Sequence, residues 1–140
     1  MDQYLRLLRR QAQQDPQLQE AYIRALERAV GGNDGSAEIS IWVTVHCHAE
    51  TSSDDVKVFA TVGLARRYVG NWMVEDIRVA YREGAILLDA LNEAEWAFNQ
   101  GNFGELSGLY DNLMYPEAWF EISEQEVHFS LPPPPPPPPP

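Results

Sequence analysis

Apolar positions at the start of the chain recur with the spacing of α-helices. The stretch from Tyr4 to Leu8 predicts a short helix, and residues 16–31 predict a second one. One face of the second helix carries Leu18, Tyr22, Ala25, Leu26 and Ala29. Asp15 is a good N-cap, Pro16 suits the first helical position, and the glycines at 31 and 32 favour an end there. The chain is therefore expected to begin with a helical hairpin.

After the glycines, the pattern changes to the period of two that is typical of strands. In residues 38–50, Ile39, Ile41, Val43, Val45 and Cys47 alternate with Ser40, Trp42, Thr44, His46 and His48. The same reasoning predicts a second strand over residues 56–69 and a third over residues 72–82. Gly70-Asn71 between them has the composition of a hairpin turn. The middle of the chain is thus predicted to be an antiparallel meander.

The last third of the folded part returns to helical spacing. Residues 85–100 and 103–114 predict two helices that are separated by Gly101 and ended by Pro116, and a last strand is expected within residues 118–131. The predicted fold class is α+β: an N-terminal helical hairpin, a three- to four-stranded antiparallel sheet, and a C-terminal helical hairpin packed on one sheet face. Residues 1–131 are expected to form a single compact domain, followed by a polyproline II tail over residues 132–140.

Charge limits the partners that the chain can bind. The net charge is −11, and residues 83–140 hold ten acidic residues and no Lys or Arg. Nucleic-acid binding needs clustered cations, so it is not expected. No stretch is apolar enough to predict a membrane span, and no secretory leader is recognised, so a cytoplasmic location is the simplest expectation. No cofactor is expected, because phosphate-loop and catalytic motifs are lacking.

The segment HCHAE is the sharpest candidate for metal chemistry. His46, His48 and Glu50 would share one face of a strand, with the two imidazoles roughly 7 Å apart, and His128 could join them from another strand. The alternative is a half-exposed sheet face with no ligand, which is favoured because Ser40 and Thr44 lie on the same face. Cys47 falls on the opposite, apolar face and is expected to be buried and inert.

Two tryptophans and the proline run are the candidates for partner binding. Trp42 lies on the polar side of its strand, and Trp96 lies off the apolar stripe of its helix. The run from Pro132 through Pro136 to Pro140 would form a rod of roughly 28 Å. It could dock a proline-binding domain, act as a spacer, or be an added tail.

The stretch AEWAFNQGNFGELSGLY, residues 94–110, resembles the helical hairpin of nuclear transport factor 2-like small domains. This resemblance covers about twenty residues and implies a ligand pocket between a curved sheet and its helices. The order of elements differs, because that family places its helices before most of its strands.

Two functional hypotheses follow from these features. The first is a non-enzymatic protein-interaction or adaptor module, which binds a basic protein surface or a proline-binding domain through its aromatic face and acidic half; a homodimer stays open. The alternative is a small ligand-binding protein or enzyme with His46, His48 and Glu50 or His128 at its pocket.

Overall fold

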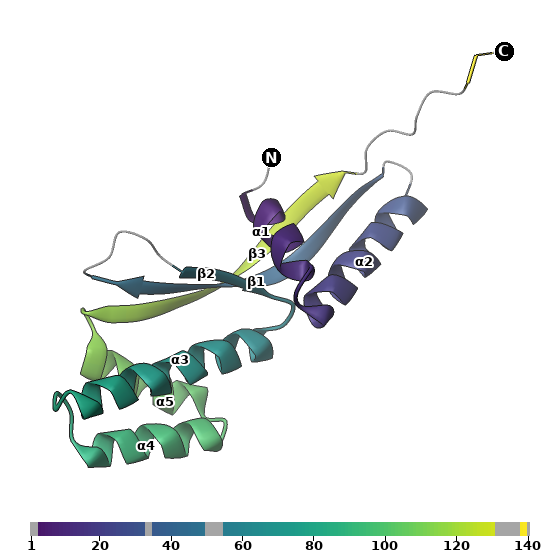
Figure 1. The fold of residues 1–140 in the computed structure, drawn as a ribbon. Coiled ribbons are helices and arrows are strands. Elements are labelled where there is room, and N and C mark those ends of the chain that lie inside the picture. The colour runs from purple at the N-terminus through teal and green to yellow at the C-terminus, as the bar shows by residue number, and fades with distance from the viewer. Residues whose placement is uncertain (1–2, 33–34, 50–54, 131–137, 140) are drawn as a thin grey trace. The chain divides into compact units, whose positions relative to one another are not determined.

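The computed structural model describes residues 3–32, 35–49, 55–130 and 138–139. The elements are α1 (Gln3–Ala12), α2 (Pro16–Gly31), β1 (Ser36–His48), β2 (Asp55–Phe59), α3 (Val62–Arg82), α4 (Leu88–Asn99), α5 (Phe103–Met114) and β3 (Ala118–Ser130) (Figure 1). The strands form an antiparallel sheet in the order β2-β1-β3. The predicted α+β class is therefore confirmed. Among the described helices, none has the length and apolar character needed to cross a bilayer.

The described residues group into two compact units. Unit 1 comprises residues 1–41 and 125–140, and unit 2 comprises residues 42–124. The long strands β1 and β3 each contribute residues to both units. Each unit is described by itself, and the expectation that residues 1–131 form a single compact domain stays a prediction.

Unit 1 contains the predicted N-terminal helical hairpin. The Asp15 side chain accepts hydrogen bonds from the backbone N–H groups of Gln17 and Leu18, and Pro16 begins α2, so the predicted start of this helix is confirmed. The larger buried apolar side chains of the unit come from both helices and both strands: Leu5, Leu8, Leu18, Ile39, Ile41, Val127 and Phe129. Burial of these side chains is the main force that holds the hairpin to the strands.

Unit 2 differs from the prediction in its middle segment. Only Asp55–Phe59 forms a strand there, and Val62–Arg82 is one continuous helix. The predicted strands over residues 56–69 and 72–82, and the turn at Gly70-Asn71, are therefore wrong beyond Phe59. The Thr61 hydroxyl accepts from the N–H of Leu64 and caps the helix. The same residues also have helical spacing. The side chains that α3 buries on one face recur every three or four positions: Ala65, Val69, Met73, Ile77 and Ala80.

Gly70 has a packing role rather than a turn role. A Cβ atom at this position would lie 3.2 Å from Cδ2 of Phe98 and 3.4 Å from Cδ2 of Leu106. The absence of a side chain therefore lets α4 and α5 approach the middle of α3. In unit 2, α3, α4 and α5 pack on one another around a shared core that includes Ile77 and Tyr110, and α4 is the helix farthest from the strands of this unit (Figure 1).

The C-terminal helical hairpin was predicted correctly. α4 ends at Asn99, and Gly101 has φ of 69°, a left-handed conformation that glycine adopts without strain. Asn102 then caps α5 through the N–H of Glu105. The expected last strand is also confirmed, as β3.

Candidate functional site

His46 lies inside unit 2 and not on an exposed sheet face. The residue is only 7% exposed, and Thr44 on the same side of β1 is also buried. The imidazole stacks on the Phe120 ring of β3, with centroids 4.0 Å apart, and lies 4.2 Å from the ring of His48. The prediction that this side of the strand is half-exposed is therefore wrong for His46. His48 is exposed, and Glu50 lies outside the described residues.

Three elements of unit 2 bring a carboxylate, a phenol and the imidazole together. The hydroxyl of Tyr110 on α5 donates to Oδ2 of Asp76 on α3, at 2.6 Å. Nε2 of His46 lies 3.3 Å from the same oxygen, although the atoms lack the alignment of a hydrogen bond. Tyr110 is completely buried. The pair of Asp76 and Tyr110 therefore anchors α3 to α5 by a charge-assisted hydrogen bond.

Burial determines the protonation states in this cluster. Burial lowers the pKa of His46, and the attraction of Asp76 offsets only part of that effect. The pKa of Tyr110 is raised far above its usual range, first by burial and then by its hydrogen bond to Asp76. The phenol thus stays a donor, and His46 is neutral near pH 7. The three side chains form a fixed polar network, and none of them lines the cavity of about 900 Å³ that unit 2 contains.

His46 should make the protein less stable in mild acid. A histidine whose folded pKa is depressed binds a proton more readily in the unfolded chain, so its contribution to stability is lost as the pH falls below about 6.5. The free energy of unfolding, measured with urea, should therefore fall between about pH 7.5 and about pH 5.5. Other groups titrate in this range too, so the wild-type change must be compared with that of His46→Phe.

Comparing the wild type with His46→Phe isolates the contribution of the His46 imidazole to the pH dependence of stability. His46→Phe should show a smaller loss of stability over the same pH interval. His48→Gln keeps the buried imidazole and removes only the contribution of His48 to lowering the His46 pKa, so its loss should lie between those of His46→Phe and the wild type. An equal pH dependence in His46→Phe and wild type would contradict the inference that His46 is held neutral.

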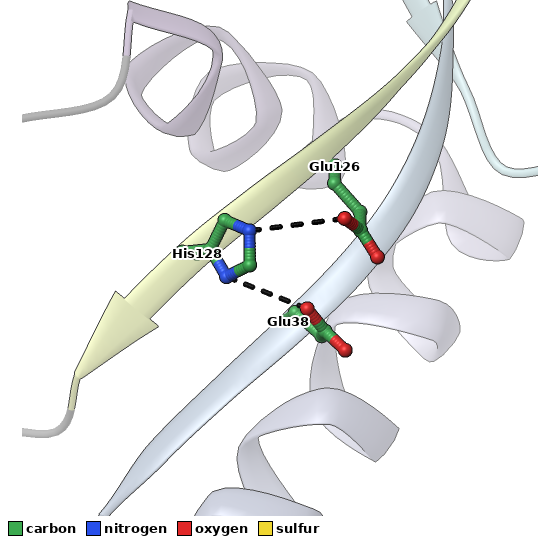
Figure 2. Close-up of side chains that lie close together, drawn as sticks. All are labelled: Glu38, Glu126 and His128. Atoms are coloured by element: carbon green, nitrogen blue, oxygen red, sulfur yellow. Dashed lines mark ion pairs between the residues drawn. The ribbon is translucent and has the colours of Figure 1, made fainter.

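His128 belongs to unit 1, where its companions are two glutamates (Figure 2). Its Nδ1 lies 3.4 Å from a carboxylate oxygen of Glu38 on β1, and its Nε2 lies 3.8 Å from one of Glu126 on β3. One ligand atom from each residue falls within 4.8 Å of the others, so the group could hold a cation. All three side chains are more than half exposed. Because opposite ring nitrogens face the two carboxylates, the geometry suits an ion-pair bridge better than convergent metal ligands.

The partner-binding candidates have different environments. Trp96 is 56% exposed on α4, whereas Trp42 is half-buried in β1. The tail candidates Pro132, Pro136 and Pro140 lie outside the described residues.

Cys47 is buried, as predicted.

Comparisons with models of protein families, with curated proteins and with solved structures found no match to this chain. The resemblance of residues 94–110 to nuclear transport factor 2-like domains therefore stays a prediction.

Proposed function

We propose that the protein is a non-enzymatic interaction module that binds a protein partner through the outer face of α4. The observation that supports this most directly is the exposure of large apolar side chains on that face. Leu88 is 49% exposed and Trp96 is 56% exposed. They are separated by about two helical turns, so they lie on the same side of α4. Leu87, which precedes Leu88 at the start of the helix, is 79% exposed. Exposed tryptophan and leucine side chains of this kind are typical anchors of protein interfaces.

The charges around these anchors favour a basic partner. Asp89 and Glu93 are exposed on α4, and no ion pair of either carboxylate is found among the described residues. The chain has no Lys or Arg after Arg82. A partner with an apolar pocket and a rim of Lys or Arg would complement both features, and its association would be accelerated by electrostatic attraction.

The proline run would supply a second contact or a spacer. Nine consecutive prolines favour an extended polyproline II rod that loses little entropy when it docks on an aromatic-lined groove. The run carries no charge, so its contribution to binding should not depend on salt.

Capture from a cell extract with variants of the α4 face tests the proposal. Immobilised full chain and Leu88→Ser/Trp96→Ser would be compared, with captured proteins quantified by mass spectrometry. Loss of two anchors should reduce the specific partners by about tenfold or more, since truncating a hot-spot residue costs about 2 kcal/mol. The captured set should be rich in basic proteins, and raised salt should weaken it.

The matched control is Ile23→Ser/Val30→Ser, which removes exposed apolar side chains from α2 in unit 1. It should capture the same partners as the full chain. A chain ending at Leu131 separates the contribution of the proline tail. Equal capture by the α4 variant and the full chain would overturn the proposal.

A further inference from the structure

A groove of about 900 Å³ lies within unit 2. It is lined by residues from the first half of α3, Gly63 to Gly70, and by residues around the connection between α4 and α5, Phe98 to Leu106. This volume falls in the range of about 300–1,000 Å³ that is typical of small-molecule sites. The groove is separate from the cluster of His46, Asp76 and Tyr110 and from the exposed face of α4.

Two arginines of the groove lack carboxylate partners in an acidic protein. Within the described part of unit 2, Lys57, Arg78 and Arg82 each lie 3.0 to 4.0 Å from a carboxylate oxygen. Arg66 and Arg67, which both line the groove, form no ion pair with any described residue. The net charge of the chain is −11, so acidic groups are plentiful. Two neighbouring cations that face a cavity without an acid between them are suited to an anionic ligand.

The other walls of the groove are aromatic rings and glycine backbone. Phe98 and Phe103 line it, and the guanidinium carbon of Arg66 lies 5.9 Å from the centroid of the Phe103 ring. This contact holds Arg66 over an aromatic face. Gly63 and Gly104, each the second residue of its helix, also line the groove without side chains to block it. Their helix starts add partial positive charge to that of the arginines.

Glu105 is the acidic residue between the groove-lining residues Gly104 and Leu106, and its carboxylate has a partner other than the arginines. Glu105, in the first turn of α5, accepts a hydrogen bond from the side-chain amide of Asn102 at 3.1 Å. Neither Arg66 nor Arg67 is neutralised by it.

We propose that this groove binds a small organic phosphate that carries a flat ring. The phosphate pairs with the guanidinium groups of Arg66 and Arg67, which match its oxygens with parallel N–H donors. The ring packs against Phe98 and Phe103, where aromatic stacking adds to the burial of apolar surface. Neither half of such a ligand alone uses both the cations and the rings, so both halves are needed for tight binding.

Calorimetric titration of the full chain with AMP tests this assignment. AMP has a phosphate dianion and a flat purine, and it should bind with a dissociation constant below about 1 mM at low salt. Arg66→Gln/Arg67→Gln should weaken binding by about tenfold or more, because two charge-assisted contacts are removed. Both arginines are exposed, so circular dichroism should show that this variant keeps its fold.

The matched control is Arg78→Gln/Arg82→Gln, which removes the same charge from the same helix outside the groove. Its affinity for AMP should stay within about twofold of the wild-type value. Adenosine and inorganic phosphate, titrated separately, should each bind at least about tenfold more weakly than AMP. Failure of AMP to bind the wild type, or an equal loss in both double variants, would overturn the proposal. Equal affinity for AMP and inorganic phosphate would overturn the role of the ring.

Discussion

Replacing Tyr110 with alanine should cost unit 2 about 3–5 kcal/mol of its free energy of unfolding, as is usual when a large buried aromatic side chain is removed. Tyr110 is 0% exposed and is the largest of the fully buried side chains. Its ring packs 5.6 Å from the ring of Phe120, centroid to centroid. The substitution therefore leaves a cavity in the core that α3, α4 and α5 share. Because small proteins are stable by only about 5–15 kcal/mol, this loss should remove a large part of the free energy that keeps the chain folded.

The hydroxyl and the ring of Tyr110 can be separated experimentally. Tyr110→Phe keeps the ring but leaves the Asp76 carboxylate without its phenolic donor, which should cost about 1–3 kcal/mol. Tyr115→Ala is the control, because Tyr115 is 63% exposed and its removal should change stability by less than about 0.5 kcal/mol.

Urea unfolding followed by tryptophan fluorescence measures all three variants. The order of stability should be wild type and Tyr115→Ala, then Tyr110→Phe, then Tyr110→Ala. If Tyr110→Phe proves as stable as the wild type, the hydrogen bond to Asp76 contributes nothing and the anchoring of α3 to α5 rests on packing alone.

The elements with strong local capping and turn signals could be predicted from the sequence. Asp15 and Pro16 define the start of α2, and Gly101 separates α4 from α5, because capping and left-handed glycine are decided within a few residues. Residues 62–82 are preceded by the Thr61 cap, but threonine is also common in strands and therefore marks the helix start only weakly. There, β-branched residues and the Gly70-Asn71 pair favour a hairpin locally, whereas packing against Phe98 and Leu106 favours a helix.

The candidate clusters depended on contacts that the sequence does not display. Residues 72–82 were predicted to form a strand, so Asp76 was not expected to lie on a helix beside α5. Its partner Tyr110 is 34 residues further along the chain, which local patterns do not reveal. Glu38 and Glu126 were missed as companions of His128 for the same reason, since pairing of β1 with β3 is a long-range event. Alternation did identify His46 and Cys47 as residues on opposite sides of β1, but it could not show that both sides become buried in unit 2.

Replacing Leu8 with alanine should destabilise the whole folded chain, and not unit 1 alone. Leu8 is 0% exposed in unit 1, and truncation of such a leucine costs about 2–5 kcal/mol. The strands β1 and β3 run without interruption from one unit into the other. Chains of this size usually unfold in one cooperative step, so the loss in unit 1 should lower the stability of unit 2 by the same amount.

The positions of the tryptophans make this prediction directly measurable. All four, Trp42, Trp72, Trp96 and Trp119, belong to unit 2, so their fluorescence reports its unfolding, while far-ultraviolet circular dichroism reports helices of both units. In Leu8→Ala, the urea midpoints from both signals should shift together. Val30→Ala, at a side chain that is 73% exposed on α2, should move neither signal by more than about 0.5 kcal/mol. A fluorescence midpoint that stays at its wild-type value while the dichroism midpoint falls would show that the two units unfold independently, which would contradict the single compact domain predicted for residues 1–131.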